Sequence, residues 1–490
     1  MAFTLDGTGP LYQQVYRAVR ADILSRTLAP GARLPSTRAL AADLGVSRNV
    51  TMLAYDQLLG EGYACARVGS GTIVAPTLPD EWSAAGAPLG PARRERTRAA
   101  PRLARTGSRA VEIGRGAPLR WDLRGPHLAY DFRFGRPAFG DFPHAVWCRL
   151  LGRRARRASR RDLDYGPPEG RLELREALAE RLRRFRGIDA EASRIVVVNG
   201  SQQALDLVTR VLVDPGERVL IEEPHYIGAR WVFMAAGAEL VPAPVDDDGI
   251  QVPTPLPARK APRLGYVTPS HQFPTGVVLP LGRRLELLDW AARSDAFIVE
   301  DDYDSEYRYA GRRLQALAGL DAEGRVIYVG TFSKLMFPAL RLGYLVLPES
   351  LVEPIVAAKA IADTGSSALE QLTLADFIRE GHFERHLNRS RVRNGARRQA
   401  VLEALQAHFG ERAEVCGAAT GLHVLVWLRG RDGRPIASVA RKAEAAGVGV
   451  YSVAPYYLRP PRRTGVLLGY GPLGERQIRE GIERLAAALS

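Results

Sequence analysis

One lysine lies in surroundings suited to carbonyl chemistry. Lys334 stands between two short apolar runs, and their Val, Ile and Leu content, bounded by Gly or Pro, predicts buried strands. A lysine in the turn between buried strands loses hydration, which lowers its pKa and makes the amine a better nucleophile toward carbonyls. Thr331, Ser333 and Arg341 supply hydroxyl and guanidinium groups that suit a phosphate. An aldehyde-reactive amine beside a phosphate site suggests pyridoxal 5′-phosphate (PLP), whereas the alternative is an ordinary surface lysine in a hairpin.

Other polar residues follow predicted strands. From residue 127 onward, strong apolar runs alternate with helical patterns, which predicts an α/β domain with a largely parallel sheet. Ligands of such sheets bind beyond the carboxyl ends of the strands. Ser201 and Gln202 follow one apolar run and begin an amphipathic helix, whose free NH groups and dipole suit a phosphate. Tyr226 follows the next run and offers a ring that could stack on a planar cofactor.

Three acids follow the apolar run at 297–299: Asp301, Asp302 and Asp304. Clustered carboxylates could hold a divalent metal or simply belong to a solvated loop. A single buried Asp has a third use, because pairing with a pyridine nitrogen keeps a PLP ring protonated and electron-withdrawing.

The first 75 residues predict a small helical unit with a wing. Two helices, capped by Ser36 and Ser47, are separated by a tight turn at Gly45. The second has Arg48, Asn49, Thr51, Met52 and Tyr55 on its more exposed side, which is helix-turn-helix geometry. The alternative is a helical oligomerisation module. The predicted elements are helices at 11–25, from Ser36 through Leu44 and from Ser47 to about Glu61, followed by a two-stranded wing at 63–74.

Residues 76–126 separate this unit from the domain at 127–490. They are rich in Pro, Ala, Gly and Arg and have no sustained helical or alternating period, which predicts a linker. Its arginines could add salt-dependent affinity for DNA or merely keep a tether solvated.

Composition limits the class of protein. The 490 residues allow two or three domains, and a net charge of +14 is compatible with a polyanionic partner, although arginine-rich composition can also reflect a GC-rich genome. No run approaches the roughly 18 apolar residues of a membrane span, and the N-terminus lacks signal-peptide character. Cys65, Cys148 and Cys416 are scattered, which indicates neither a disulfide framework nor a metal site. We therefore expect a cytoplasmic protein, in which the arginine run at 153–161 faces solvent or DNA.

The N-terminal pattern is specific enough to indicate a family. LAPGARLPSTRALAADLGVSRNVTMLAYDQLLGEGY, followed by GSGTIVA, closely resembles the winged helix-turn-helix of GntR-type regulators. That resemblance implies double-stranded DNA as a partner. The residues it implies at the DNA are Arg38, Ser47, Arg48, Asn49, Thr51, Gly69 and Gly71.

The remainder of the chain resembles fold-type I PLP enzymes of the aminotransferase class. The match runs from YDFRFGRPAFGDFP through DYGPPEGRLELREALA to the C-terminus and implies a large α/β/α subdomain followed by a smaller α+β subdomain. It implies Lys334 as the Schiff-base lysine, Asp301 at the pyridine nitrogen, with Asp302 as the alternative, and Tyr303 at the phenolic oxygen. The other cofactor-binding residues it implies are Tyr226 on the ring and Ser201, Gln202, Ser333 and Arg341 at the phosphate.

The two halves together resemble the MocR subfamily of bacterial transcription regulators. The resemblance implies a homodimer, with Tyr130 and Tyr457 as candidate interface groups, that binds an operator with repeated half-sites when the protein is on the nucleoid. PLP itself or a small amine would be the effector, and some MocR-like regulators control vitamin B6 genes. A γ-amino acid is the second choice of effector.

Two departures from the aminotransferase pattern argue against efficient catalysis. Phe273 replaces the Asn of Asn-Pro-x-Gly, and Leu467 stands where an arginine would bind a substrate carboxylate. Arg459, Arg462 or Arg463 could substitute for that arginine. The sequence therefore favours a regulator over an active aminotransferase with an appended DNA-binding domain, and a PLP-storage protein is a third possibility.

Overall fold

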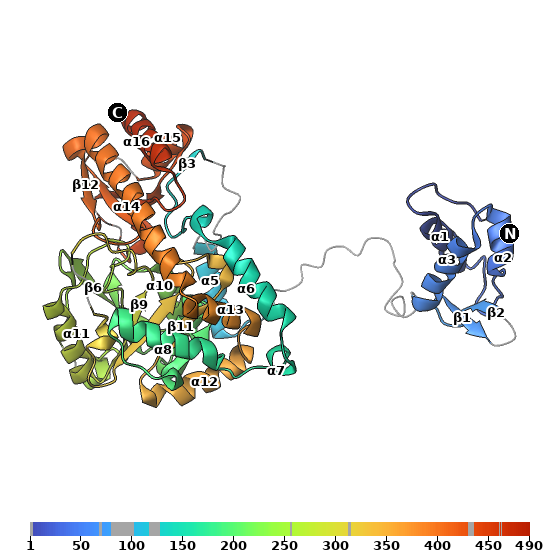
Figure 1. The fold of residues 1–490 in the computed structure, drawn as a ribbon, viewed down its shortest axis with the longest axis horizontal. Coiled ribbons are helices and arrows are strands. Elements are labelled where there is room, and N and C mark those ends of the chain that lie inside the picture. Colours follow the sequence, from blue (N-terminus) through green and yellow to red (C-terminus); the bar gives the residue numbers. More distant parts are fainter. Residues whose placement is uncertain are drawn as a thin grey trace. The chain divides into compact units, whose positions relative to one another are not determined.

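The structure is a computed structural model and describes residues 3–67, 71–79, 102–116, 128–254, 257–311, 315–429, 436–459, 461 and 463–490. The chain divides into two compact units, Met1–Pro101 and Arg102–Ser490, each of which is drawn in Figure 1. Of the helices in these described ranges, none combines the length and apolar character needed to cross a lipid bilayer.

The first unit is a small helical fold with a β-hairpin, as the sequence predicts. Its described elements are α1 (Leu11–Leu24), α2 (Thr37–Leu44), α3 (Arg48–Gly60), β1 (Ala64–Arg67) and β2 (Gly71–Val74). Ser36 and Ser47 cap α2 and α3, because their side-chain oxygens accept hydrogen bonds from backbone NH groups in the first turn of each helix. Gly45 ends α2 in the left-handed conformation, with φ +63°. The hairpin strands pair antiparallel and pack with the helices around one apolar core.

The buried face of α3 differs from the prediction. The sequence predicts that Leu53 lies on the inward side and leaves Thr51 and Tyr55 exposed, yet Leu53 is 54% exposed and the other two are buried. Each polar tip has a partner outside α3: Thr51 Oγ1 donates to the carbonyl of Thr37, and Tyr55 Oη donates to that of Pro35. These tertiary hydrogen bonds allow the two side chains to be buried, and polarity alone did not reveal them.

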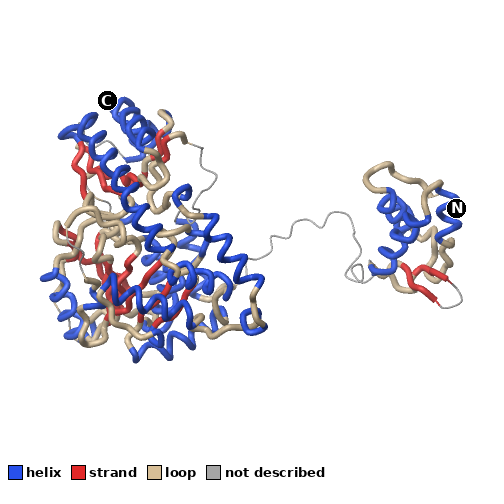
Figure 2. The backbone as a smooth tube through the Cα atoms, viewed as in Figure 1, coloured by secondary structure: helices blue, strands red, loops and turns tan. Residues whose placement is uncertain are grey.

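The second unit is built around a mixed sheet with a smaller sheet beside it (Figure 2). Its described helices are α5 (Arg105–Gly116), α6 (His144–Arg156), α7 (Arg160–Leu163), α8 (Leu172–Arg186), α9 (Ser201–Leu212), α10 (Ile227–Ala236), α11 (Leu281–Ser294), α12 (Glu349–Asp363), α13 (Ala368–Arg379), α14 (His382–Phe409), α15 (Ile436–Ala445) and α16 (Glu475–Leu489). Its described strands are β3 (Tyr130–Asp131), β4 (Ile195–Val198), β5 (Arg218–Glu223), β6 (Glu239–Asp246), β7 (Gly249–Ile250), β8 (Leu264–Val267), β9 (Phe297–Asp302), β10 (Val326–Thr331), β11 (Gly343–Val346), β12 (Ala413–Cys416), β13 (His423–Leu428), β14 (Val448–Gly449), β15 (Tyr451–Ser452) and β16 (Thr464–Gly469).

The large sheet has the strand order β4-β11-β10-β9-β8-β5-β6-β7, and its centre, from β10 to β6, is parallel. Alternate side chains of each strand enter different cores. Val197 of β4 and Tyr328 of β10 pack in the core that includes α8 and α13, whereas Val196 and Val329 pack in the core that includes α9, α10 and α12. Helices on both faces of a mostly parallel sheet form the α/β/α subdomain that the sequence predicts.

The C-terminal part forms the expected smaller α+β subdomain. Strands β12, β13, β16 and β15 form an antiparallel sheet, and α14, α15 and α16 pack with it around a separate core. Phe132, which immediately follows β3, also belongs to this core. The segment at the start of the predicted 127–490 domain therefore packs against the end of the chain.

The prediction of an irregular linker across 76–126 is wrong over part of its length. Residues 105–116 form α5, which contacts α10, and the Arg109 guanidinium donates to the carbonyl of Ala236 at 3.0 Å. Packing against α10 of the same unit stabilises a helix that the sequence pattern of these residues did not indicate. Residues 80–101 and 117–127 of that segment lie outside the described residues.

Part of the arginine run at 153–161 has a packing role. Arg153 and Arg154 of α6 form ion pairs with Asp376 of α13, and Arg153 also pairs with Glu380. These two arginines therefore hold α6 against α13, an alternative to solvent or DNA that the sequence pattern did not indicate. Arg157 and the arginines that follow it are exposed.

Candidate cofactor site and DNA-facing helix

Lys334 lies just beyond the carboxyl end of β10 and is largely withdrawn from water. Its Nζ donates a hydrogen bond to the carbonyl of Gly135 at 2.7 Å. Burial, assisted by the charge of Arg341, lowers the pKa of Lys334 to about 8, although Asp304 and Asp301 act in the opposite direction. The lysine therefore has the desolvated, more nucleophilic amine that its place between two apolar runs predicts.

The strand order brings the predicted phosphate-binding residues together. Strand β11 lies between β4 and β10 and runs antiparallel to both. The end of β4, the end of β10 and the start of β11 therefore lie at one edge of the sheet, which brings Asn199, Lys334 and Arg341 to the same edge. The Arg341 guanidinium donates to the carbonyl of Asn199 at 2.7 Å. Gly200, with φ +88°, permits this approach, because a Cβ there would lie 3.0 Å from an Arg341 nitrogen. Ser201 then begins α9, whose N-terminal NH groups suit an anion.

Two further predicted residues connect to this edge. Ser333 lies beside Lys334, and its backbone NH donates to Thr331 Oγ1 at 3.2 Å. The Gln202 side chain donates to the carbonyl of Gly228 at 2.9 Å and so joins the start of α9 to α10. Its amide is therefore engaged by the protein, and its backbone NH in the first turn of α9 is the group available to a phosphate.

Tyr226 immediately precedes α10 and lies close enough to Asp301 and Arg341 for their charges to act on its hydroxyl. Its ring lies edge-on to Phe273, with centroids 5.9 Å apart. Burial, reinforced by the charge of Asp301, raises the pKa of Tyr226 to about 12, so its hydroxyl stays neutral. The neighbouring acid and the apolar surroundings suit a ring that stacks on a planar group.

Asp301 and Asp302 have different environments because adjacent strand residues point to opposite faces. Asp301 accepts a hydrogen bond from Tyr266 Oη at 2.8 Å, yet its Oδ1 is buried without a partner. Burial raises the pKa of Asp301 to about 7. Asp302 instead forms a 2.5 Å ion pair with Arg186 and accepts from Tyr328. Asp302 Oδ1 is also buried without a hydrogen-bond partner, but the charge of Asp302 is already paired with Arg186. Asp301 has no such ion pair among the described residues, so it is the acid whose free oxygen suits a cationic pyridine NH.

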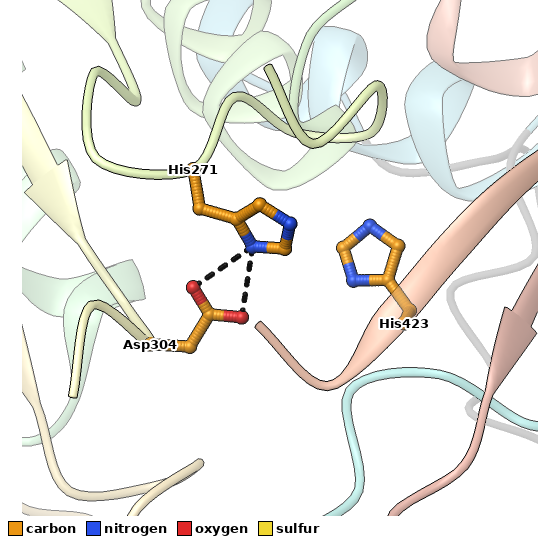
Figure 3. Close-up of side chains that lie close together, drawn as sticks. All are labelled: His271, Asp304 and His423. Atoms are coloured by element: carbon orange, nitrogen blue, oxygen red, sulfur yellow. Dashed lines mark hydrogen bonds and ion pairs between the residues drawn. The ribbon is translucent and has the colours of Figure 1, made fainter. Parts of the chain in front are cut away.

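Tyr303 joins a buried polar cluster, shown in Figure 3, that the sequence did not reveal. Its hydroxyl donates to the carbonyl of His271 at 2.8 Å, and His271 Nδ1 lies 3.0 Å from both carboxylate oxygens of Asp304. The His423 ring, from β13, lies 4.9 Å from the His271 ring. Because a carboxylate can only accept, His271 Nδ1 carries its hydrogen.

The cluster of His271, Asp304 and His423 has the chemistry of a metal site, since one ligand atom from each lies within 4.8 Å of the others. Its observed contacts are hydrogen bonds, however. Asp304 engages His271 Nδ1, and His423 Nε2 lies 3.3 Å from the carbonyl of Pro274. Burial, with a further contribution from His271, lowers the pKa of His423 to about 3. The cluster therefore joins two subdomains through two imidazole rings and a carboxylate beside Tyr303.

His271 was within reach of sequence reasoning, because it follows β8 where ligand-binding residues are expected. His423 was not, because it belongs to the other subdomain, some 150 residues further along the chain. The solvated-loop alternative does not describe these acids, since Asp301 and Asp302 of β9 and Asp304 just beyond it are all buried and have hydrogen-bonding partners within the protein. Of the three, Asp304 belongs to the possible metal-ligand group with His271 and His423.

The two departures from the aminotransferase pattern are both apolar in the fold. Phe273 is buried among aromatic rings, and Leu467 is fully buried and packs in the same cluster. Arg463, one proposed substitute for a carboxylate-binding arginine, pairs with Glu414 at 2.5 Å. Arg459 is exposed, and Arg462 lies outside the described residues.

The helix-turn-helix residues divide into exposed and structural groups. Arg38, Arg48 and Asn49 are exposed on α2 and at the N-terminal end of α3, as a DNA-facing surface requires. Ser47 is exposed and caps α3. Thr51 is fully buried, and the prediction that its side chain faces DNA is wrong, because it supports the packing of α3 against the α2 region. Gly71 begins β2 with φ +80°, whereas Gly69 lies outside the described residues.

Comparison with known proteins assigns both halves. Residues 11–74 match the model of bacterial regulatory proteins of the gntR family, and residues 140–457 match the model of aminotransferase class I and II. The chain is 40% identical to the probable rhizopine catabolism regulatory protein MocR of Rhizobium meliloti, over 99% of this chain and 94% of that protein. It is 31% identical to the pyridoxine biosynthesis transcriptional regulator PdxR of Corynebacterium glutamicum, over 98% of this chain and 95% of that protein.

The second unit also has solved structural relatives. The α-aminoadipate aminotransferase LysN of Thermus thermophilus, solved with N-(5′-phosphopyridoxyl)-L-leucine, superposes with a TM-score of 0.70 at 30% identity. The superposition covers 79% of this chain and 97% of LysN. The described fold from β4 to α16 is thus that of a PLP-dependent aminotransferase.

Proposed function

The chain belongs to the MocR subfamily of GntR-type bacterial transcription regulators, and from this premise we propose that it is a regulator whose aminotransferase-like domain senses PLP or an amine that reacts with it. The operator-binding activity of the winged helix then depends on the state of the cofactor pocket. The protein acts in the cytoplasm and on the nucleoid.

One observation carries the cofactor part of the proposal: Asp301 Oδ1 is buried and has no partner, and the Asp301 carboxylate lies close enough to Lys334 for the two charges to interact. An unpaired buried acceptor costs free energy, and a protonated pyridine nitrogen would remove that cost. On the same sheet edge, Arg341 and the start of α9 suit the phosphate. When bound, PLP supplies an aldehyde that condenses with amines and a ring that accepts electron density.

The DNA part rests on the exposed arginine and asparagine side chains of the first unit. Arg38, Arg48 and Asn49 have hydrogen-bond donors suited to phosphates and base edges. A homodimer, with PLP sites near the subunit interface, would present two such helices to repeated half-sites of double-stranded DNA. Tyr130 and Tyr457 stay candidates for that interface.

The effector is proposed from the pocket and from one relative. Phe273 and Leu467 are apolar where an aminotransferase would bond the cofactor oxygen or a substrate carboxylate, so an amino acid would be held weakly. This favours PLP itself as the sensed molecule, followed by a small amine such as a γ-amino acid. The name of PdxR refers to pyridoxine biosynthesis, which supports vitamin B6 synthesis genes as the regulated set.

The proposal is tested by operator binding. Fragments of genomic DNA that the purified protein retains would be identified first, and one labelled duplex would then be titrated with and without PLP. We expect the dissociation constant to change with PLP in the wild-type protein but not in Lys334→Ala. An affinity that is the same in all four conditions would reject PLP sensing.

A second candidate is an aminotransferase with an appended DNA-binding domain. The combination of Lys334, Asp301 and Arg341 in one pocket favours it, because these groups would serve catalysis as well as sensing. Incubation with an amino acid and a 2-oxo acid distinguishes the two. Sustained transfer over many turnovers identifies the enzyme, whereas a regulator stops after at most one equivalent per site.

A further inference from the structure

A cavity apart from the candidate cofactor site has five arginines among its lining residues. It has a volume of about 40 Å³ and lies where the end of α8, the loop after β9 and the first half of α14 meet. Lys334, Arg341 and Ser201 are not among its lining residues. Its charged lining residues are Arg181, Arg186, Arg284, Arg308, Arg391, Glu306 and Glu384.

Most of these arginines already have acidic partners. Arg181 pairs with Glu306 at 3.0 Å and with Glu384 at 2.9 Å. Arg186 pairs with Asp302, and Arg284 lies 3.9 Å from Glu300, two acids that are not among the lining residues. In these pairs the charge of each arginine is already compensated by a carboxylate. The remaining arginines are therefore the ones that could bind an added anion.

Two arginines of the cavity lack an acidic partner among the described residues. Arg308 makes no ion pair there, and burial lowers its pKa, as expected for a cation that loses water without gaining a carboxylate. Arg391 donates to the side-chain oxygen of Asn388 at 3.0 Å, which leaves its charge uncompensated. The five arginines and two glutamates of the lining carry a formal charge of +3, which the acids paired with Arg186 and Arg284 from outside the lining, Asp302 and Glu300, reduce to +1.

Four buried polar atoms of the lining have no hydrogen-bond partner within the protein. They are Arg186 Nε, Ser305 Oγ, Arg308 Nε and Thr420 Oγ1. Arg186 is 8% exposed and Thr420 is 2% exposed, so solvent at the surface does not satisfy them. Buried donors that are left unpaired cost about 1–3 kcal/mol each, which makes a permanently bare cavity unfavourable.

From these observations we propose that the cavity binds a small oxyanion, namely a carboxylate or a phosphate group. Both classes present several acceptor oxygens in a compact group, which matches guanidinium and hydroxyl donors that converge on one space. One water needs about 10–15 Å³ of such space, so 40 Å³ holds about three waters or one oxyanion. The exposed Asn388 marks the side on which the rest of a larger metabolite would leave the cavity.

The cavity wall shares its backbone with the polar cluster of the candidate cofactor site. Three lining residues are next in sequence to residues of the cluster around His271. Ser270 precedes His271 itself, Ser305 follows Asp304, and Thr420 precedes Gly421, which packs closely against the His271 ring. A residue that contacts an anion in the cavity is therefore the sequence neighbour of a residue of that cluster in three separate segments of the chain. The anion site itself does not depend on the regulatory function proposed above.

The test is calorimetric titration of the full-length protein with inorganic phosphate and, separately, acetate, at constant ionic strength set with chloride. Phosphate could also occupy the cofactor's phosphate cradle, so the protein is first loaded with PLP. If no PLP binds, the titration is made on Arg341→Gln, which disables the cradle alone. Failure of PLP binding and failure of the anion site are thus observed separately.

We expect saturable binding of one of the two anions, weakened at least ten-fold by Arg391→Gln and by Thr420→Val. Arg389→Gln, two residues away on α14, exposed and outside the lining, is the matched control and should bind as the wild type does. Absence of saturable binding by either anion would overturn the proposal and leave water as the occupant. Equal loss in Arg391→Gln and Arg389→Gln would also overturn it, because that pattern indicates unspecific charge attraction.

Discussion

Tyr266 Oη donates a 2.8 Å hydrogen bond to one carboxylate oxygen of Asp301, while the other oxygen is buried and unpaired. A carboxylate in this state is stable only if it takes up a proton or meets a cationic donor. A bound ligand with an NH group should therefore change the protonation state of Asp301. Without such a ligand, the stability of the protein should depend on pH.

The first prediction concerns the stability of the PLP-free protein. The pKa of Asp301 is about 7 in the fold and 3.8 ordinarily, so the folded state binds the extra proton between these values. The protonated Asp301 therefore stabilises the folded state relative to the unfolded state. This contribution is fully present below about pH 4 and is lost as pH rises through about 7. Asp301→Asn removes the titration and should unfold at a temperature that falls less between pH 5 and pH 8.

Glu222, whose pKa burial also raises to about 7, is present in both proteins, so its titration contributes to both curves, and the Asp301 charge is the smallest of the causes named for that shift. A pKa difference of about three units bounds the effect at about 4 kcal/mol. Parallel melting curves for wild type and variant would show that Asp301 is not responsible. Saturation with PLP should abolish the difference in the wild type.

The second prediction concerns the amine. Because the pKa of Lys334 is lowered to about 8, the fraction of neutral amine, and with it the initial rate of PLP condensation, should rise with pH and level off above about 8. The rise in absorbance near 400 nm measures this rate. Lys334→Ala should give no such band and no borohydride-fixed cofactor, whereas the exposed Lys442→Ala should match the wild type. A rate that still climbs steeply toward pH 10 would contradict the lowered pKa.

Much of this site was predictable because strand ends and polar residues coincide in the sequence. Lys334, Arg341 and Ser201 each follow or precede a short apolar run, and the parallel sheet brings such positions to one edge. The contact between Lys334 and Gly135 was not predictable. It joins residues 199 positions apart, and nothing in the local pattern of either residue indicates the other.

The errors have a common physical cause. Thr51 and Tyr55 are buried through hydrogen bonds to carbonyls before α3, and α5 is stabilised by its contact with α10, which follows it by more than 100 residues. Both depend on partners distant in the chain. A hydropathy pattern depends only on the residues of the segment itself. It therefore cannot distinguish a polar side chain that is buried with a distant hydrogen-bond partner from one that is exposed to water.

The third prediction separates these structural residues from DNA-facing ones. Arg48→Ala should weaken operator binding by about 1–3 kcal/mol if it reads a base, or reduce the salt dependence by about one ion if it contacts a phosphate, with the melting temperature unchanged. Thr51→Val keeps the shape but removes the hydroxyl bonded to the Thr37 and Arg48 carbonyls. It should cost about 1–2 kcal/mol of stability.

Filter binding at several salt concentrations and thermal unfolding of the same preparations give both quantities. The exposed Asp56→Asn on the same helix serves as a control for unspecific effects on α3. If Thr51→Val binds DNA poorly with undiminished stability, the threonine reads DNA after all. If Arg48→Ala melts early, its role is structural.

The fourth prediction concerns the cluster of His271, Asp304 and His423. As a hydrogen-bonded network it should survive chelation, so EDTA treatment should leave the unfolding temperature unchanged. Asp304→Asn should lower the free energy of unfolding by about 1.5–3 kcal/mol, because it replaces the charged acceptor of the His271 NH. Asp206→Asn, at a half-buried residue whose carboxylate pairs with Arg210, should change the free energy of unfolding by less than about 1 kcal/mol.

A metal site would behave differently in both respects. A chelator would lower the unfolding temperature, and Asp304→Asn would lose a stoichiometric metal that elemental analysis detects in the wild type. The observed contacts favour the network, because His271 Nδ1 meets Asp304 at ordinary hydrogen-bond distance and His423 Nε2 faces a carbonyl. The network also holds the Tyr303 hydroxyl, so Asp304→Asn should weaken PLP binding several-fold even where the protein stays folded, whereas Asp206→Asn should leave PLP binding unchanged.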